Sequence, residues 1–348
     1  MTSPKPARLV AVVVTHNRLE PLKTCLSALH VVAELDALVV VDNASTDGTA
    51  EWLAGLEDAR IRVVRSSENI GGAGGFALGM SFAQQEFNPD WVVLMDDDAW
   101  PEPSALRCFL DEERSAIALY AAAVFDEDGA ISALNRVFWN PFTSVSVFLK
   151  ALIFGKSGYY LGPKEYQSDQ TKSVDFATFV GLFIPRACLN IVDPPDRRLF
   201  LYCDDLDYCH RARAAGFSLI FDPRIRFTHA CSTFIRRSRI YTPLWKSYYG
   251  HRNELLIIRK TAQMLTVPVS LGLVTLWALR SVFYGREAPS YLRLLWLAMK
   301  DAYRQDFSRS HPDILRLAAR GIGCVKTNNA SPNAPRKSPV STGNKTSA

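Results

Sequence analysis

Three adjacent carboxylates, Asp96, Asp97 and Asp98, follow an apolar run at residues 91–95. Neighbouring negative charges repel one another, so this cluster destabilises a fold unless a cation neutralises it. Carboxylate oxygens suit a hard divalent ion such as Mg2+ or Mn2+. Because alternate residues of an extended segment share a face, Asp96 and Asp98 could bind one ion together. The alternative is a solvated acidic turn, and the strand before the cluster favours the metal site.

A glycine-rich segment at residues 69–76 is a second candidate site. Glycine lets the backbone approach a ligand closely, and N–H groups near a helix start bind phosphate. The alternative is a tight loop. Gly72, Gly74 and Ala77 loosely fit a dinucleotide-binding fingerprint, but that fingerprint should follow the first strand. In this chain the polar residues 15–18 stand there instead.

Acidic residues gather again at residues 204–207. A carboxylate here could act as a general base on a hydroxyl group, although capping of a helix by Asp204 or Asp205 is the alternative. His229 ends a predicted strand and could be a third metal ligand, although a lone histidine is more often structural. Cys203, Cys209 and His210 lack the paired Cys-x-x-Cys spacing, which argues against a zinc site.

The elements that must position these residues alternate between strand and helix. Strands are predicted at residues 9–14, 37–41, 61–65 and 91–95, and helices at 19–29, 49–56 and 75–86. This alternation predicts an α/β fold with a mainly parallel central sheet and helices on both faces. Polar residues follow the strand ends, where open α/β sheets bind their ligands.

The rest of the chain is less regular. It predicts helices near 103–113 and 204–215, strands near 117–125, 176–184, 217–221 and 225–229, and helical structure after 240. We expect an N-terminal tail at 1–7, a catalytic domain at 8–235, a helical C-terminal region at 236–325 and a disordered basic tail at 326–348.

Composition excludes several classes of protein. Of the 348 residues 48% are apolar and 22% charged, which is typical of a globular protein. A net charge of +5 is too small to indicate nucleic-acid binding. Seven scattered cysteines form no disulfide framework, so we expect a reducing compartment. The polar, proline-containing start does not resemble a signal peptide.

Taken in order, the motifs resemble one enzyme family. The sequences VVTHNR at 13–18, VDNASTDG at 41–48, NIGG at 69–72, DDD at 96–98 and DD at 204–205, together with His229, resemble the family-2 glycosyltransferases of GT-A fold. Within that family the chain most resembles the bacterial rhamnosyltransferase and galactofuranosyltransferase branch. The resemblance covers roughly residues 8–260.

The resemblance implies a role for each matching residue. The donor nucleotide-sugar would be bound by Thr15, Asn17, Asp42, Asn69, Gly71, Gly72 and Asp97. The metal, Mg2+ or Mn2+, would be bound by Asp96, Asp98 and His229. The acceptor would be bound by Phe179, Val180, Gly181, Asp204 and His251, with Asp205 as the catalytic base. Arg252 and Asn253, which belong to a late motif of the branch, would contact donor or acceptor.

The implied activity is an inverting transfer of a sugar, with rhamnose or galactofuranose favoured. The donor would be a UDP- or dTDP-sugar, and the acceptor a glycan or polyprenyl-linked glycolipid of cell-surface polysaccharide synthesis. The Gln-x-x-Arg-Trp motif of processive family members does not occur in the sequence. Two alternatives stay open: a nucleotidyltransferase, which should carry a basic glycine-rich loop after the first strand, and a non-catalytic sugar-binding module.

Residues 262–304 are candidates for peripheral membrane contact. The apolar run 264–279 has sixteen residues and contains Pro268, so it falls short of the ~20 needed to span a bilayer. It predicts a core helix or an interfacial segment. Residues 291–304 predict an amphipathic helix, which could lie on an anionic membrane or pack on the catalytic domain. We expect a cytoplasmic protein at the inner face of the plasma membrane.

Overall fold

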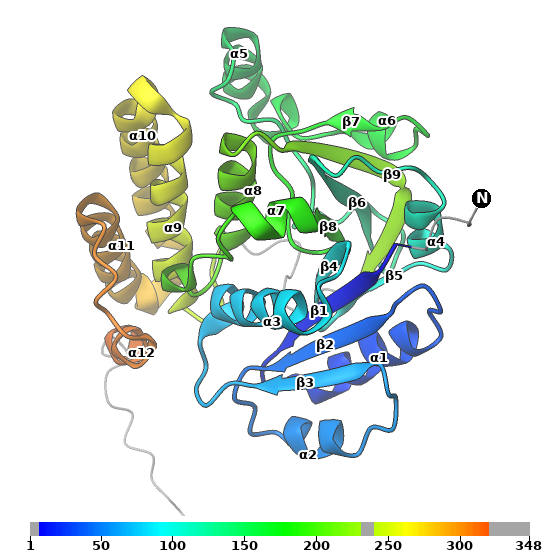
Figure 1. Cartoon of the computed structure of the whole chain (residues 1–348). Coiled ribbons are helices and arrows are strands. Elements are labelled where there is room, and N and C mark those ends of the chain that lie inside the picture. Colours follow the sequence, from blue (N-terminus) through cyan, green and yellow to red (C-terminus); the bar gives the residue numbers. More distant parts are fainter. Residues whose placement is uncertain (1–6, 231–239, 320–348) are drawn as a thin grey trace, which may run out of the picture.

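Four parallel strands form one half of the central sheet in the computed structural model, which describes residues 7–230 and 240–319 (Figure 1). They are β1 (Leu9–Thr15), β2 (Ala37–Asp42), β3 (Ile61–Arg65) and β4 (Trp91–Asp96). Their order is β3-β2-β1-β4, so β1 has a neighbour on each side. Every residue of β1 is buried, which explains its continuous apolar sequence. The predicted α/β fold is confirmed.

The other half of the sheet is mixed, so the sheet is less parallel than predicted. Its strands are β5 (Ala99–Pro101), β6 (Ala118–Asp126), β7 (Lys172–Ser173), β8 (Leu182–Pro185) and β9 (Ser218–His229). β8 runs antiparallel to both β4 and β6, whereas β9 is parallel to β6. The two strands predicted at 217–221 and 225–229 are one strand, because β9 stays paired with β6 across a register shift at Ala122.

Helices cover both faces of the sheet. One face packs against α1 (Leu19–His30), α2 (Thr49–Ala54) and α4 (Ala105–Leu110). The other packs against α3 (Gly71–Phe87), α7 (Arg186–Ile191) and α8 (Asp204–Ala214). Alternate residues of β1 serve the two faces: Val10 and Val12 belong to one apolar cluster, and Ala11 and Val13 to the other.

Helix α3 lies unusually close to β1 because it presents glycines to the strand. A Cβ atom at Gly75 would lie 2.4 Å from Val14 Cγ1, and one at Gly79 would lie 2.4 Å from Val12 Cγ1. The helix begins at Gly71, four residues before its predicted start. Its first turn therefore reaches the carboxyl end of the sheet, beside the polar residues that follow the strands.

The C-terminal part is a separate helical layer. It contains α9 (Lys246–Thr261), η3 (Gln263–Leu265), α10 (Thr266–Leu279), η4 (Arg280–Glu287), α11 (Ala288–Arg304) and α12 (His311–Ala319). The remaining short helices are α5 (Val145–Phe154), η1 (Gly155–Gly158), α6 (Pro163–Tyr166) and η2 (Arg197–Leu199). A third apolar cluster joins α9 and α11 to Ala73 and Leu199 of the catalytic part.

The segment Gln263–Arg304 is helical and, by length and composition alone, apolar enough to cross a membrane. The prediction of a core helix at residues 264–279 is wrong, because Trp277 is the one buried residue of α10. By contrast, α11 buries its apolar face against α9, through Tyr291, Leu294 and Leu295. A position at a membrane interface thus fits α10, whereas packing against the rest of the protein fits most of α11.

Parts of the predicted domain division fall outside the described residues. These are the tail at 326–348, most of the N-terminal tail at 1–7, and the boundary at 235–236. Within the described residues, the last strand ends at His229 and the next helix begins at Lys246.

Candidate active site

The acidic cluster lies at the carboxyl end of β4, next to the end of β1. Thr15 Oγ1 donates a hydrogen bond to Asp97 Oδ2 at 2.7 Å. Arg18 Nε lies 3.1 Å from Asp97 Oδ1, and the same guanidinium pairs with Asp98. The end of β1 thus supplies one hydroxyl and one cation to the carboxylates. Neither Thr15 nor Arg18 is near them in sequence, and the parallel pairing of β1 with β4 brings them together.

His229 reaches the cluster from the end of β9, which pairs with β5 directly after the carboxylates. Its Nε2 lies 3.1 Å from Asp98 Oδ1, and its Nδ1 lies 2.7 Å from Asn135 Oδ1. The Asn135 amide is oriented by a second bond, from its Nδ2 to Thr178 Oγ1 at 2.9 Å. Its Oδ1 is therefore an acceptor, so Nδ1 of His229 carries a proton.

This orientation matters for metal binding. With the proton on Nδ1, Nε2 of His229 either presents a lone pair to a carboxylate oxygen or is itself protonated. A divalent cation between His229 and Asp98 satisfies both groups. Ligand atoms of Asp96, Asp98 and His229 all lie within 4.8 Å of one another, and no other such group occurs among residues 7–230 and 240–319. The residues therefore fit a hard metal ion with mixed oxygen and nitrogen ligands.

Burial sets the protonation of the carboxylates in the absence of a cation. It raises the pKa of Asp97 to about 7, even though Arg18 opposes the shift. Burial and the charge of Asp98 raise the pKa of Asp96. Burial would raise the pKa of Asp98 too, but the hydrogen bond and charge of His229 hold it below its usual value. The cluster therefore concentrates its negative charge at Asp98, beside His229.

A second pair of carboxylates opens helix α8. Asp204 is buried, and Asp205 is half-buried with its Oδ1 accepting from the N–H of Leu206 at 2.7 Å. Desolvation, with a smaller contribution from the charge of Asp96, raises the pKa of Asp205 to about 7. Burial, followed by the charge of Asp205, raises the pKa of Asp204 well above its usual value. A carboxylate poised near neutrality suits a general base.

The loop before α8 is held in an unusual conformation. Phe200, Tyr202 and Cys203 have φ angles of 65°, 70° and 61°, in the left-handed region that costs non-glycine residues energy. Asn253 of α9 compensates, because its Nδ2 donates to the carbonyl oxygens of Leu199, Leu201 and Tyr202 at 2.8–2.9 Å.

Arg252 holds the same loop. Its Nη2 donates to the carbonyl oxygens of Arg198 and Leu199, both at 2.9 Å, and its Nε donates to Asn253 Oδ1. Both side chains are buried. The sequence resemblance implied contacts of Arg252 and Asn253 with donor or acceptor, whereas the structure gives them to the loop that carries Asp204 and Asp205.

The glycine-rich loop touches that loop directly. Gly71 has φ +73°, and a Cβ atom there would lie 2.1 Å from the carbonyl oxygen of Phe200. On its other side, the glycine loop is held by Asn43. The Oδ1 atom of Asn43 accepts a hydrogen bond from the N–H of Ile70 at 2.9 Å, and its Nδ2 donates to the carbonyl oxygen of Gly71 at 3.0 Å. Asn69 Oδ1 closes the turn by accepting from the N–H of Gly71 at 2.9 Å.

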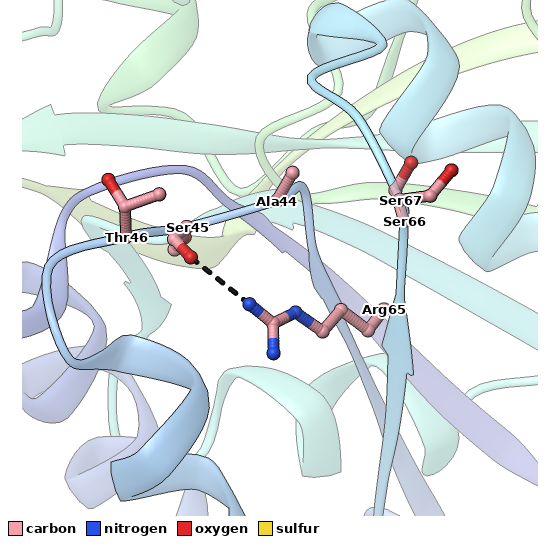
Figure 2. A pocket seen from close by; sticks show the side chains of 6 residues that line it. All are labelled: Ala44, Ser45, Thr46, Arg65, Ser66 and Ser67. Atoms are coloured by element: carbon pink, nitrogen blue, oxygen red, sulfur yellow. Dashed lines mark hydrogen bonds between the residues drawn. The ribbon is translucent and has the colours of Figure 1, made fainter.

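A shallow open pocket of about 450 Å³ lies where β2 and β3 end (Figure 2). Its lining residues are Ala44, Ser45, Thr46, Arg65, Ser66 and Ser67. Figure 2 shows the Arg65 side chain extending across it to the carbonyl oxygen of Ser45, at 3.3 Å. Asn17 holds the rim, since its Oδ1 accepts from the N–H of Thr46 at 2.7 Å.

Asp42 lies beneath this pocket. Its Oδ1 accepts from the N–H of Ser45 at 2.9 Å, and its Oδ2 lies 3.3 Å from Arg65 Nε. Among the described residues, Oδ2 has no hydrogen-bond donor, although the side chain is fully buried. Its negative charge is paired with Arg65, so a ligand N–H could reach Oδ2 only if the Arg65 side chain moved aside.

The residues expected to bind the acceptor are mostly interior. Phe179 packs between Phe76 and Tyr208 in one apolar cluster, and Val180 lies in the other. The N–H of Gly181 donates to the carbonyl oxygen of Leu94, beside the acidic cluster. This segment therefore supports the floor of the site with its backbone, and its contact with the acceptor stays a prediction.

His251 lies away from any surface. It is 1% exposed, hydrogen-bonded to Tyr291 and packed on the Trp277 ring. Its expected contact with the acceptor stays a prediction, and one that this position disfavours.

Sequence reasoning missed several residues of the site. Asn135, which orients His229, lies in an irregular loop and carries no sequence signal. Arg65 and Ser66 could have been found, because they end a predicted strand at the same edge of the sheet as Asp42. Arg252 and Asn253 were singled out, but their role required the fold.

Comparisons with known proteins agree with this geometry. Residues 10–152 match a family model described as glycosyl transferase family 2. The chain is similar to galactofuranosyltransferase GlfT1 of Mycolicibacterium smegmatis, with 28% identity over 238 residues, 64% of this chain and 71% of that protein. It is also similar to the N-acetylglucosaminyl-diphospho-decaprenol L-rhamnosyltransferase of Mycobacterium tuberculosis, with 25% identity over 246 residues, 64% of this chain and 75% of that protein.

Among solved structures, the chain is similar to the crystal structure of GalNAc-T7 with UDP, GalNAc and Mn2+. The TM-score is 0.53 at 12% identity, over 74% of this chain and 48% of that one. The chain thus spans about half the length of that structure, and the likeness supports the fold.

Proposed function

We propose that this chain is a family-2 glycosyltransferase and that it moves one sugar from a nucleotide-sugar to an acceptor hydroxyl, with inversion at the anomeric carbon. One observation carries the proposal. Three possible metal ligands, Asp96, Asp98 and His229, lie together, and the charge of Asp96 acts on the carboxylate of Asp205. The pKa of Asp205 is raised to about 7. The first group suits a departing diphosphate, and the second suits an attacking hydroxyl.

The donor would lie along the carboxyl edge of β1, β2 and β3. The pocket beside Arg65 would receive the base, and Oδ2 of Asp42 would accept the ring N–H of uracil or thymine once the Arg65 side chain moved aside. Gly72 has open space where a Cβ atom would stand, so a diphosphate can approach its backbone. Asn17 and Asn69 would hold the loops around the nucleotide, and Thr15 would do so through Asp97.

Asp96, Asp98 and His229 would hold Mg2+ or Mn2+. When bound, the ion would neutralise the charge that develops on the departing nucleoside diphosphate. Asn135 would keep the His229 ring in the orientation that presents Nε2 to the ion. Arg18, paired with Asp97 and Asp98, would limit the negative charge of the cluster before donor and metal arrive.

Asp205 would remove the proton from the acceptor hydroxyl. The hydroxyl oxygen then forms a bond to the anomeric carbon as the bond to the diphosphate oxygen breaks, and the pair of electrons leaves with the nucleoside diphosphate. One such displacement inverts the anomeric configuration. Burial raises the pKa of Asp204 well above its usual value, and in its protonated form this side chain would donate a hydrogen bond to the acceptor.

Rhamnose and galactofuranose are the favoured sugars, because relatives named for transfer of each match the chain. The second relative is named for a diphospho-decaprenol acceptor. We therefore take the acceptor to be a glycan carried on a polyprenyl diphosphate, at the cytoplasmic face of the membrane.

A donor screen tests the proposal. Release of nucleoside diphosphate would be measured from UDP-galactofuranose and dTDP-rhamnose with Mg2+, Mn2+ or EDTA. Without acceptor, we expect slow donor hydrolysis that EDTA abolishes and that Asp98→Asn removes. With acceptor present, Asp205→Asn should lower the rate of sugar transfer by ~10²–10⁴-fold. The control is Glu20→Gln, at an exposed carboxylate of α1. Donor binding without metal-dependent turnover would instead support a sugar-binding module.

A further inference from the structure

Helix α5 exposes an apolar surface of its own. None of its ten residues is buried, and its sequence VSVFLKALIF is mostly apolar. Its exposed large apolar side chains are Val145, Leu149, Leu152, Ile153 and Phe154, each 50–76% accessible. A contiguous apolar helix held in water is uncommon unless another surface covers it.

Helix α10, in the C-terminal layer, also exposes an apolar surface. Trp277 is its one buried residue. Val267, Leu271, Leu276 and Leu279 are 54–66% exposed, and Val282 of the following η4 is 74% exposed. The two helices are more than a hundred residues apart in sequence, and Figure 1 draws both at the upper margin of the molecule, with α5 projecting outward.

The residues that follow α5 and α10 act electrostatically on one half-buried acid, Glu254 of α9. Lys156, just after α5, and Arg280, just after α10, both counter the rise in the pKa of Glu254 that its burial causes. Glu254 in turn acts on Tyr160, which also feels the charge of Asp205. The residues that follow the two apolar helices are therefore linked electrostatically to the surroundings of Asp205, the proposed base.

Charge distinguishes the partner that this surface fits. The segments 129–164 and 255–286, which contain α5 and α10, hold no acidic residue, although the whole chain has 35. Each segment holds four basic residues: Arg136, Lys150, Lys156 and Lys164 in the first, and Arg259, Lys260, Arg280 and Arg286 in the second. Two copies of such a surface would repel each other. An anionic bilayer supplies both an apolar interior and negative headgroups.

We propose that α5 and α10 dock together on an anionic lipid bilayer, with their apolar side chains in the acyl boundary and Lys150, Lys156 and Arg280 at the headgroups. Asp205 then faces the membrane surface, where a lipid-linked acceptor presents its sugar. The docking geometry stands on the exposed helices, and its purpose rests on the function proposed above.

Flotation of the full chain with vesicles tests the docking surface. The vesicles contain phosphatidylcholine alone or phosphatidylcholine with phosphatidylglycerol. We expect binding to the anionic vesicles, weakened more than tenfold by Leu152→Glu with Ile153→Glu in α5, and likewise by Leu271→Glu in α10. Lys150→Glu should weaken it on the order of fivefold for each unit of charge changed. Val31→Glu, at an exposed valine after α1, should leave it unchanged.

The outcomes separate docking from catalysis. Each variant is first checked for an unchanged melting temperature and for wild-type donor hydrolysis in vesicle-free buffer, so that lost flotation reports the surface. Wild-type chain that hydrolyses donor but stays with the vesicle-free fraction overturns the docking proposal. So does flotation that survives both glutamate variants, or a dimer in solution that those variants dissociate. Chain that floats but never hydrolyses donor overturns the proposed function and leaves the surface intact.

Discussion

His229 illustrates how much of this site depends on a residue that the sequence does not mark. Its ring is oriented by Asn135, whose own amide is oriented by Thr178. The orientation leaves Nε2 opposite Asp98 Oδ1, so that pair needs a positive charge. From sequence alone, His229 is a histidine at the end of a predicted strand that could be a third metal ligand, and the family resemblance implies the same role.

The raised pKa of Asp205 predicts the pH dependence of transfer. A base must be deprotonated to act, so turnover should fall as the pH drops below about 7 and level off above it. Burial is the main cause of the shift, and the charge of Asp96 adds to it. The measurement is kcat/KM for sugar transfer between pH 5.5 and 8.5 at saturating metal.

The control for this pH profile is the pH dependence of the activity that Asp205→Asn retains. The kcat/KM of this variant should no longer fall as the pH drops below about 7, because no titrating base remains at position 205. A variant that kept this fall would assign the titration to another group and remove Asp205 from the role of base.

Buried His251 predicts a pH dependence of stability rather than of activity. Burial lowers its pKa from 6.5 to about 3, so the folded state keeps it neutral while the unfolded state protonates it. Between these values the unfolded chain binds more protons, and the free energy of unfolding therefore falls as pH is lowered. His251→Gln should flatten that slope by up to ~1.4 kcal/mol per pH unit. Urea unfolding of both proteins at pH 6.5, 5.5 and 4.5 measures it, and equal slopes would contradict the prediction.

At the scale of elements, the sequence predicted the first hundred residues well. Continuous β-branched runs marked β1, β2 and β4 because those strands are buried in the sheet. It failed where tertiary pairing decides the structure. β9 continues through Pro223 because its residues 223–225 bulge out between Asp222 and Arg226, which pair with the consecutive Ala122 and Ala123 of β6. α3 begins early, at Gly71, which lies against the backbone of Phe200.

Gly71 and Gly72 offer a matched pair of substitutions in the glycine loop. Gly71→Ala places a Cβ atom 2.1 Å from a backbone oxygen at a positive φ, so it should lower the melting temperature strongly. Gly72→Ala meets nothing within 4 Å, so stability should stay within a few degrees of the wild type. If the diphosphate approaches this backbone, Gly72→Ala should still weaken donor binding about tenfold or more. Calorimetry of donor binding decides it, and unchanged affinity would place the diphosphate elsewhere.

Asn253 connects the helical layer to the base. Its amide donates to three carbonyl oxygens of the strained loop before Asp204. Asn253→Ala should release that loop and lower kcat on the order of a hundredfold, because a displaced base loses its geometry. Donor affinity should change less, since the proposed donor pocket lies at the ends of β2 and β3.

The control for Asn253 is Asn190→Ala, at an asparagine whose side chain receives one bond from Gln84. It should leave kcat unchanged. Equal losses of kcat and of donor affinity in Asn253→Ala would indicate general unfolding rather than a positioning role.

At the scale of the whole molecule, the helical layer is part of the catalytic unit. Its Arg252 and Asn253 hold the loop before Asp205, the proposed base, and its apolar cluster includes Ala73 of α3. The family model covers residues 10–152, so the match alone says nothing of this layer. The domain boundary predicted at residue 235 lies between the two segments that these contacts join, which are about fifty residues apart in sequence.

The contacts between the helical layer and the loop before Asp205 predict the result of truncation. A chain ending after Thr261 keeps α9 but loses α11, whose Tyr291, Leu294 and Leu295 cover it. Tyr248 of α9 also loses its hydrogen bond to Asp301, at 2.8 Å. Because large apolar side chains contribute about 1.5–3 kcal/mol each when buried, the loss exceeds what a marginally stable domain tolerates. We expect an aggregating or partly unfolded protein without donor hydrolysis, seen by circular dichroism and dye binding. A soluble, active product would show instead that the sheet and α9 hold the proposed base Asp205 without the rest of the layer.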